Sequence, residues 1–479
     1  MRSSSGRRLL ALLAVLALAL AACGNDDNDD GDPTTDPPTT ADGATDDEAA
    51  PVDPGRCPVD ALADADGPVT IDFWHAMTAE LETTLVALTD EYNASQDRVQ
   101  VNLVYQGSYD ETAEQFFTAS RGGNAPTLVQ MEETRLQMAI DSQTMLPAAA
   151  CVEADGYDLS DHLPAVIDQY TVEGQLWPMP FNTSGPVLYY NTTMFEAAGI
   201  DAPPTTLEEM RDAAQTIVDS GVAPSGFAFE LSPWFFEQWF AKGNQPLVDN
   251  DNGRTGRATT TNIGSDTGVE LFRFVDDLIN DGLAINIGRN ASGIDSLLAI
   301  ANEDVAMTFG TSAALGSILV VLEGGEFPNV GVGVAPLPGS TDGGVIVGGA
   351  AVWMVERDQD DVEIAAGWDY LRWLNEPDQQ ARWHIGTGYI PIRQTALDSD
   401  EVAALWDEEP GFRVAYDQLL ASELEFGGPV VGDYPGLRDA IVEAMERMIL
   451  QGVAPETVAA DAARRAEESI TSYNSSIDR

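Results

Sequence analysis

The chain has 479 residues, 44% of them hydrophobic, and a formal net charge of −56 at pH 7. A surface this acidic repels a phosphate backbone over most of its area, which excludes nucleic acid as a partner. The hydrophobic content is sufficient for folded cores, and the chain is longer than a single core usually organises, so we expect two lobes.

The N-terminus has the organisation of a bacterial export signal. Arginines precede the apolar run 9–20, and two alanines then lead to Cys23. This order is typical of a secretory signal, and the apolar run is too short to span a membrane. The cysteine after the small residues resembles the bacterial lipoprotein signal. That resemblance implies a signal peptide over 1–22, an acylated Cys23 and an exported chain anchored to the outer face of the cytoplasmic membrane. An ordinary signal peptide or a short membrane anchor is the alternative.

The segment after Cys23 predicts an extended tether. Residues 24–54 consist mainly of Asp, Thr, Pro, Gly and Ala, which bury too little surface to offset chain entropy. We expect a lipidated cysteine followed by a disordered acidic tether over 23–66. If Cys23 carries lipid, Cys57 and Cys151 remain as an even pair in an oxidising compartment. This favours a disulfide, although their spacing alone leaves the pairing open.

The folded part begins with alternating strands and amphipathic helices. Hydrophobic periodicity predicts strand, helix, strand, helix and strand over 69–73, 81–92, 99–105, 111–120 and 127–131. This β-α-β-α-β start favours an α/β fold.

Further elements follow with clear end signals. Thr206 is the expected N-cap of a helix over 206–220, with Glu209 three residues on and Gly221 at the C-terminal end. Glycine-punctuated strands are expected at 330–334 and 348–354, and helices at 361–374, 378–384, 434–451 and 455–475.

The sequence carries no recognised catalytic or metal-binding motif. It has no Gly-x-Ser-x-Gly elbow, His-Glu-x-x-His helix or Walker-type loop. His75, His162 and His384 lie far apart in the sequence, without the spacing of metal ligands. Asp249–Gly253 departs from the pattern of a calcium loop, so we interpret this segment as a polar turn. We therefore expect no enzyme activity, no metal and no cofactor. A secreted glycosidase or phosphodiesterase is the enzyme alternative, because the many carboxylates always allow a pair to be proposed.

Six motifs occur in order from about Gly67 onward. They are Trp74–Met77, Gly107–Tyr109, Gly123–Pro126, Phe181–Asn191, Gly348-Gly349 before Trp353, and Thr387–Ile392. In this order they resemble those of the extracellular solute-binding proteins of ABC importers, in the carbohydrate-type family whose close subgroup binds glycerol 3-phosphate and its diesters. The resemblance implies an α/β, two-lobed periplasmic-binding-protein-like fold of type II, with the ligand in the interlobe cleft. It also implies capture by lobe closure, a monomer, and permease and ATPase subunits as partners.

We expect each lobe to be built from two segments, with crossing strands between the lobes. The first lobe is expected to comprise 67–180 and 304–346. The second is expected to comprise 181–303 and 347–479.

The resemblance implies a ligand site in which the hydroxyl-binding part comes from several segments. Tyr109 and Glu133 fall where the subgroup's first lobe supplies a phenol and a carboxylate for glycerol or polyol hydroxyls. Ser184 matches a serine of the site, and Thr311 keeps a hydroxyl where the family has another serine. The register at Thr311 leaves Ser312 open as the alternative.

The anion-binding part of the implied site consists of a backbone amide, a phenol and a cation. Gly349 brings its N–H close to an oxyanion without a side chain in the way. Tyr389 and Arg438 match the phenol and guanidinium that grip the phosphate. The alternative for Arg438 is an ion pair with Asp433 or Asp439 on its own helix.

The chain departs from the subgroup at one position. Leu231 stands where glycerol-phosphate binders commonly have a tryptophan, and Trp234 follows three positions on. A leucine leaves space for a larger headgroup such as choline, and Trp234, Phe235, Phe236 and Trp239 offer π faces to a quaternary ammonium or a sugar ring. The same aromatic run is equally consistent with a lobe core.

The expected solute is therefore glycerol 3-phosphate or a glycerophosphodiester. A neutral mono- or oligosaccharide is the alternative within the same class, and it gains weight if Arg438 points away from the ligand. A ligand sensor that feeds a membrane receptor would have the same fold and site.

Overall fold

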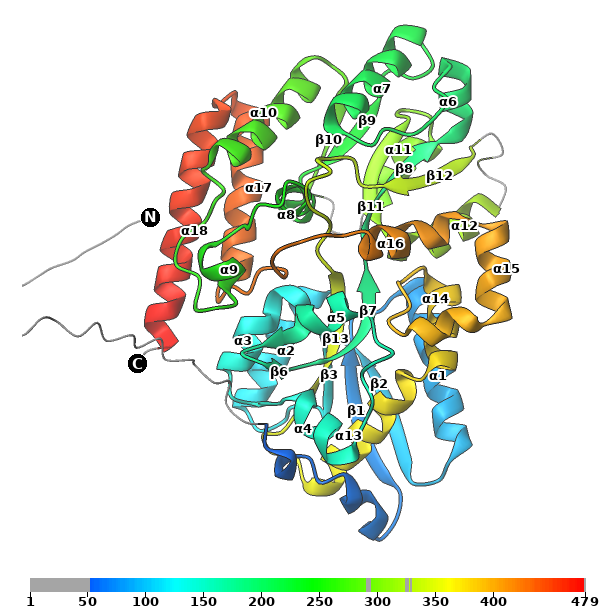
Figure 1. The fold of residues 1–479 in the computed structure, drawn as a ribbon, viewed down its shortest axis with the longest axis vertical. Helices are drawn as coiled ribbons and strands as arrows, with labels where there is room; N and C mark the ends of the chain where they lie inside the picture. The colour runs from blue at the N-terminus through cyan, green and yellow to red at the C-terminus, as the bar shows by residue number, and fades with distance from the viewer. Residues whose placement is uncertain (1–51, 290–293, 324–326, 328–329, 478–479) are drawn as a thin grey trace, which may run out of the picture. The chain divides into compact units, whose positions relative to one another are not determined.

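The computed structural model describes residues 52–289, 294–323, 327 and 330–477. The expected signal peptide, Cys23 and the first part of the expected tether lie outside the described residues. Within the described part, two large β-sheets each carry helices, so the fold is α/β with two lobes, as expected (Figure 1).

The first lobe contains a six-stranded sheet of β1 (Val69–His75), β2 (Val99–Tyr105), β3 (Leu128–Glu132), β4 (Met145–Leu146), β7 (Met179–Ser184) and β13 (Gly348–Val355). The strand order is β2-β1-β3-β13-β4, and β7 also pairs with β13. Strands β1, β2 and β3 are parallel, which requires crossover helices between them. The helices of this lobe are α1 (Ala79–Ser95), α2 (Tyr109–Arg121), α3 (Leu136–Asp141), α4 (Ala148–Asp155), α5 (Pro164–Tyr170), α13 (Asp361–Leu374) and α14 (Pro377–Thr387).

The second lobe contains a five-stranded sheet of β8 (Pro186–Asn191), β9 (Phe227–Glu230), β10 (Ala284–Gly288), β11 (Met307–Thr311) and β12 (Val332–Pro336). The strand order is β10-β9-β11-β8-β12. Its helices are α6 (Thr192–Ala198), α7 (Leu207–Ser220), α8 (Pro233–Lys242), α9 (Asp249–Gly253), α10 (Asp266–Asn280), α11 (Ile294–Ala301), α17 (Tyr434–Gln451) and α18 (Pro455–Ile477).

Further helices and short elements lie between or beside the two lobes. Helix α16 (Gly411–Leu420) packs on β12 and β8 of the second lobe, and α15 (Asp400–Glu408) packs between α16 and α14. Helix α12 (Leu315–Glu323) contacts α1 and α14 of the first lobe. The remaining elements are the hairpin β5 (Thr171–Val172) and β6 (Gln175–Leu176), and the 3-10 helices η1 (Pro54–Arg56), η2 (Val59–Asp64), η3 (Glu133–Arg135), η4 (Ser312–Ala314) and η5 (Gln394–Asp398).

The chain crosses between the sheets at Gly185, the single residue between β7 and β8. The membership of later strands differs from the lobe division expected from the sequence. Strands β11 and β12, within 304–346, belong to the second sheet, whereas β13, within 347–479, belongs to the first. The physical reason is that sheet membership follows the pairing partner, and β13 pairs with the distant β3 in the register Trp353↔Val129. A strand's own residue pattern does not reveal such a partner.

Local signals predicted helix ends well, because capping depends on neighbouring residues. Thr206 caps α7 by accepting a hydrogen bond from the Glu209 N–H at 3.1 Å, and Gly221 ends the helix with a φ of 72°. The helix expected over 361–374 is α13. Asp249–Gly253 is a polar turn as expected, and three consecutive residues in it have φ values of 53°, 53° and 58°.

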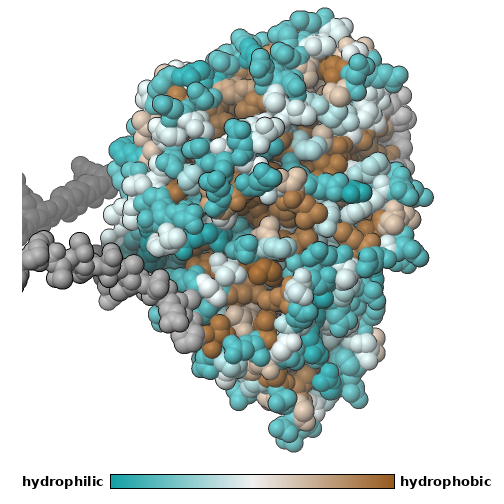
Figure 2. All heavy atoms as spheres, viewed as in Figure 1, coloured by the Kyte–Doolittle hydropathy of each residue, from teal (hydrophilic) through white to brown (hydrophobic). Residues whose placement is uncertain are grey.

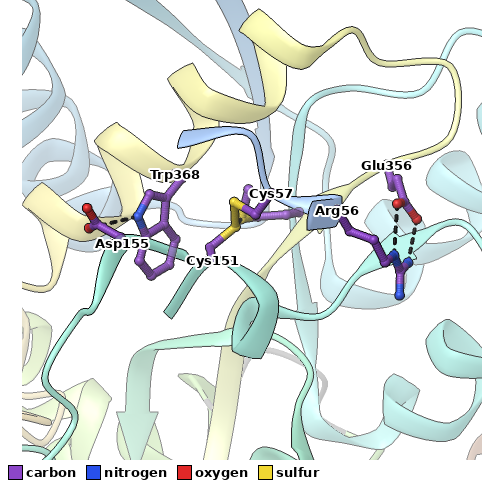
Figure 3. Close-up of a disulfide and its surroundings, with 7 residues drawn as sticks. Arg56, Cys57, Cys151, Asp155, Glu356 and Trp368 are labelled. Carbon is purple, nitrogen blue, oxygen red and sulfur yellow. Dashed lines mark hydrogen bonds and ion pairs between the residues drawn. A yellow bond between two sulfur atoms is a disulfide. The ribbon is translucent and has the colours of Figure 1, made fainter. Parts of the chain in front are cut away.

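The end of the expected tether is folded onto the first lobe. A disulfide joins Cys57 to Cys151 of α4, so the pairing considered from the cysteine count is present (Figure 3). The Arg56 Nε donates to Glu356 Oε1 at 2.9 Å, and Leu62 is buried in the first-lobe core. The prediction of a disordered tether up to residue 66 is therefore wrong at its C-terminal end. The 3-10 helices η1 and η2 order the chain from Pro54 to Asp64.

Two main hydrophobic clusters fill the lobes, and the first extends from the first lobe into the second at Tyr189 and Ala228. The first includes Phe73 and Trp383, and the second includes Phe236, Phe272 and Met448. Hydrophilic residues predominate on the face shown in Figure 2, and hydrophobic residues gather near its middle, around α5 and α16. Within the described ranges, none of the helices combines the length and apolar character that a membrane span requires.

Candidate ligand-binding site

The centre of the candidate site is Arg438, on the first turns of α17. Asp433 caps this helix by accepting from the Gly436 N–H, and Pro435 occupies the second helical position, where its missing N–H costs nothing. The Arg438 guanidinium donates to Glu237 of α8 through two bonds, Nε–Oε1 at 2.9 Å and Nη2–Oε2 at 2.8 Å. Glu237 is thus a bidentate partner within the second lobe.

Arg438 also reaches the first lobe. Its Nη1 lies 3.3 Å from Glu132 Oε2, and its Nη2 lies 3.4 Å from Glu133 Oε1. The side chains are shielded from water, with exposed fractions of 15% for Arg438, 7% for Glu133 and 2% for Glu237. Arg438 therefore pairs neither with Asp433 nor with Asp439 among the ion pairs of the described residues, but bridges the two lobes.

The charges of this cluster are unequal, because three carboxylates face one guanidinium. Burial raises the pKa of Glu133 well above its ordinary value, the Glu132 charge raises it further, and Arg438 opposes both effects. Burial lowers the pKa of Arg438, but the charges of Glu237 and Glu132 outweigh burial and raise it overall. The guanidinium stays charged, while the carboxylates compete for it.

A second group joins Tyr109, at the start of α2, to Tyr389, which follows α14. The two phenol oxygens lie 3.2 Å apart, and Asn182 Nδ2 donates to the Tyr109 hydroxyl at 2.8 Å. Asn182 is held in turn by Gln130, whose Nε2 donates to Asn182 Oδ1 at 2.7 Å. The Tyr389 ring stacks on Trp383 with centroids 5.5 Å apart. Both phenols are therefore fixed by neighbours before any solute arrives.

The two tyrosines lie within electrostatic range of the carboxylates. Burial raises the pKa of Tyr109 well above its ordinary value, and Tyr389 and Glu132 add to the effect. Burial is also the main cause of the raised pKa of Tyr389, and Glu132 and Glu133 contribute. Both phenols therefore stay protonated at neutral pH. One O–H is used in the bond between the two hydroxyls, and the other remains as a donor for a solute.

Glycines 348 and 349 allow the strands of the site to approach closely. In β13, Gly349 has a φ of 102° and pairs with Thr183, and an added Cβ would run into the Asn182 carbonyl oxygen. Its neighbour Gly348 pairs with Ser184, which is 4% exposed. A Cβ on Gly348 would lie 2.6 Å from a ring carbon of Trp234. The indole of the second-lobe helix α8 thus packs directly on first-lobe backbone.

Thr311 and Ser312 use their hydroxyls locally. The Thr311 Oγ1 accepts from the Ala313 N–H at 3.3 Å and so caps η4, and its carbonyl accepts from the Tyr189 hydroxyl at 2.8 Å. The Ser312 Oγ accepts from the Gly185 N–H at 3.3 Å, at the crossing between the sheets. Among the described residues, neither hydroxyl bonds to the Arg438 cluster or to the tyrosine pair.

The aromatic run after Leu231 divides between core and site. Leu231 is 3% exposed and belongs to the second-lobe core, as do Phe235, Phe236 and Trp239, whose placement matches the core role considered from the sequence. Trp234 is only partly buried and lies against Gly348.

Sequence reasoning missed several residues of this region. Glu132 precedes Glu133 directly, and Asn182 lies within a recognised motif, so both had a local signal. Glu237 had none, because it sits in an aromatic run and its partner is 201 positions away. The hydroxyl of Tyr170 on α5 is buried with no hydrogen-bond partner among the described residues, as is Glu133 Oε2. Buried polar atoms without a partner call for an explanation such as a water, an ion or a bound solute, and similar atoms occur elsewhere in the described chain, for example in Ser225.

The structure brings four of the predicted residues into two bonded groups. Glu133 meets Arg438, and Tyr109 meets Tyr389, whereas Ser184 and Gly349 sit on the adjoining pair of strands. A hollow of about 430 Å³ lies elsewhere, on the second lobe between α6 and α7, and is lined by apolar residues such as Pro203 and by polar ones such as Glu209 and Asp212. Among the described residues, no group of three or more His, Cys, Asp or Glu side chains is placed to hold a metal ion.

The fold and the site define a class, a two-lobed solute-binding protein in which polar side chains from both lobes meet. The model of the bacterial extracellular solute-binding protein family matches residues 87–410, and the chain belongs to this family. Its relatives are binding proteins rather than enzymes, and the class serves ABC importers by delivering small polar solutes to permease and ATPase subunits.

Individual relatives cover most of the chain. The sn-glycerol-3-phosphate-binding periplasmic protein UgpB of Pectobacterium atrosepticum is 30% identical over 396 residues, which cover 80% of this chain and 87% of that protein. The structure of UgpB from Mycobacterium tuberculosis in complex with glycerophosphocholine matches with a TM-score of 0.71 at 20% identity, covering 85% of this chain and 99% of that one. The GacH receptor of Streptomyces glaucescens, solved unliganded and with acarbose, matches with a TM-score of 0.70 at 20% identity, with coverage of 85% and 99%. These two structures share the fold.

Proposed function

We propose that this solute-binding protein captures glycerol 3-phosphate or a glycerophosphodiester, and that an acylated Cys23 anchors it to the membrane. The observation that carries the proposal is the position of Arg438. This second-lobe cation lies within 3.4 Å of the first-lobe carboxylates, so an anion bound to it is in reach of both lobes.

In the proposed complex, Arg438 and Tyr389 bind the phosphate group. A guanidinium offers paired donors that match phosphate oxygens, and a phenol adds a further donor. Glu133 accepts hydrogen bonds from the glycerol hydroxyls, and Tyr109 donates to them. Gly349 and Ser184, on the paired strands β13 and β7, supply a backbone amide and a hydroxyl.

Lobe closure follows from this division of contacts. The guanidinium is contributed by α17 of the second lobe, whereas Tyr109 and Glu133 are contributed by the first lobe. A solute that touches both sets binds the closed arrangement more tightly than an open one, and so shifts the population toward closure. The closed form is then the one presented to the permease.

The relative from Pectobacterium atrosepticum, which is named for binding sn-glycerol 3-phosphate, supports this proposal. The partly buried indole of Trp234 supports the diester in particular, because an aromatic ring can attract a quaternary ammonium.

A neutral mono- or oligosaccharide is the second candidate. The observation that favours it is the pairing of Arg438, whose donors already bond to Glu132, Glu133 and Glu237. Carboxylates and phenols are also common partners of sugar hydroxyls.

Titration calorimetry decides between the two. The exported chain carrying Cys23→Ser is titrated with glycerol 3-phosphate, glycerophosphocholine and a panel of small sugars. The phosphate esters should bind, and Arg438→Ala should weaken them by at least about 2 kcal/mol, or roughly 30-fold. Arg289→Ala is the matched control, because Arg289 pairs with Glu446 at the far end of α17. Binding of sugars alone would favour the second candidate, and unchanged ester binding in Arg438→Ala would place the anion elsewhere. Mass spectrometry of the mature N-terminal peptide tests acylation of Cys23.

A further inference from the structure

Four of the five N–H donors of the Arg438 guanidinium bond to carboxylates in this structure. Nε donates to Glu237, Nη1 to Glu132, and Nη2 to both Glu133 and Glu237. Because only one N–H, on Nη1, remains for another acceptor among the described residues, an incoming anion that takes paired donors must displace at least one carboxylate.

The distances indicate which carboxylates yield. Glu237 holds the guanidinium through two bonds of 2.8 and 2.9 Å, is 2% exposed and lies in the same lobe as Arg438. Glu132 and Glu133 lie at 3.3 and 3.4 Å and come from the other lobe. Bonds at these longer distances are weaker, so the anion replaces the two first-lobe carboxylates and leaves Glu237 in place.

We infer that an anionic solute binds at Arg438 together with a proton, which the Glu132–Glu133 pair takes up, and that Glu237 is the positioning residue that holds the guanidinium for the solute. This inference rests on the proposed function and adds to it the proton and the role of Glu237.

The proton is required because displacement leaves two adjacent carboxylates without their cation and beside a new negative charge. A buried carboxylate in that position neutralises rather than remaining charged. Burial already raises the pKa of Glu133 in the solute-free protein. The next cation along the chain, Arg135, pairs with Asp110. The titratable groups that act on Glu133 are Glu132 of β3, Glu237 of α8, Tyr170 of α5, Tyr389, and Arg438 and Tyr434 of α17.

Because the two glutamates are adjacent, the proton belongs to the pair rather than to one residue. Linkage then fixes the sign of the pH dependence. Uptake of one proton on binding weakens the affinity as the pH rises, by up to tenfold per pH unit above the range where the solute-free pair is already protonated.

Calorimetry with glycerophosphocholine measures this uptake directly. Its phosphodiester has no ionisable proton in the neutral range, so protons exchanged with the buffer come from the protein. The titrations are run at several pH values in buffers of different ionisation enthalpy. The slope of observed against ionisation enthalpy gives the number of protons, which should approach one within the neutral range.

Three variants separate the roles. Glu132→Gln combined with Glu133→Gln keeps the shape of both side chains but leaves neither able to ionise, so proton uptake should largely disappear and the affinity should lose most of its pH dependence. Glu446 lies on α17, the helix of Arg438, and pairs with Arg289, so Glu446→Gln should behave as the parent protein does. Glu237→Gln should weaken binding roughly tenfold and keep the proton uptake. A merely structural Glu237 would instead lower the melting temperature and leave the dissociation constant of the folded protein unchanged.

Binding of glycerophosphocholine without proton exchange at any pH, or full proton uptake in the variant with both glutamates replaced by glutamine, would overturn the inference while leaving the proposed function intact. Absence of binding by every phosphate ester would instead refute the proposed function, and the inference with it.

Discussion

Removal of Arg438 should destabilise the solute-free protein, independently of any effect on binding. The substitution Arg438→Ala leaves Glu237, which is 2% exposed, without its cation, and Glu132 and Glu133 lose theirs as well. Breaking a buried ion pair by removing one partner costs about 3–5 kcal/mol. Since Arg438 keeps an exposed fraction of 15%, we expect the lower end, about 3 kcal/mol.

A double substitution tests the reason for that loss. Replacing both members of a buried pair with apolar residues of similar size is often neutral, because no unpaired charge remains. Arg438→Met combined with Glu237→Met should therefore recover part of the stability lost in Arg438→Ala, because Glu132 and Glu133 still lack their cation, yet it should not restore binding of glycerol 3-phosphate. Comparison of Arg438→Ala with the double variant therefore separates the effect on stability from the effect on solute binding.

Urea denaturation followed by tryptophan fluorescence, without solute and at pH 8, measures these free energies of unfolding. The loss in Arg438→Ala should shrink at pH 5, where the unpaired carboxylates accept protons more readily. Equal stability of Arg438→Ala and the parent protein at pH 8 would refute the reasoning. So would a double variant no more stable than the single one.

Three further predictions concern stability and packing. Removing the disulfide with Cys57→Ser and Cys151→Ser should lower the free energy of unfolding by about 4 kcal/mol, as expected for a closed loop with a sequence separation of 94; thermal denaturation with and without reductant checks this, and equal melting temperatures would contradict it. Gly348→Ala should displace the Trp234 ring, which an added Cβ would meet at 2.6 Å; we expect a changed Trp234 fluorescence and a roughly tenfold or larger loss of affinity for glycerophosphocholine, and unchanged values of both would show that the indole has room to move. Burial raises the pKa of Glu230 to about 7, so its carboxyl stays protonated in the folded state while the unfolded chain ionises near pH 4, and stability falls as the pH rises between these values. Glu230→Gln should therefore equal the parent protein at pH 4 and be more stable by about 2–3 kcal/mol at pH 8, and an equal difference at both pH values in urea denaturation would be inconsistent with this account.

Elements defined by neighbouring residues could be predicted from the sequence. The cap at Thr206, the αL end at Gly221 and the helix Asp361–Leu374 depend on side chains within one or two turns. The lobe to which residues 304–346 belong could not be predicted in this way, because it depends on which strands pair. Strands β11 and β12 pair with β8, and β13 pairs with β3, and those partners lie far away in the chain.

The candidate site shows the same limit. Tyr109, Glu133, Tyr389 and Arg438 were expected from a family resemblance, and the structure brings them together in two bonded pairs. Glu237 could not be expected, because a glutamate within an aromatic run carries no local sign of a partner on a distant helix. The competition of three carboxylates for one cation emerges only when the helices and both lobes are placed.

The most direct test of the central claim, that Arg438 and first-lobe side chains hold one phosphate ester between the lobes, is a crystal structure of the complex with glycerophosphocholine. The account predicts phosphate oxygens within hydrogen-bonding distance of the Arg438 guanidinium and the Tyr389 hydroxyl, with glycerol hydroxyls on Glu133 and Tyr109. A complex in which Arg438 keeps all its carboxylate partners, and the phosphate lies elsewhere, would contradict it.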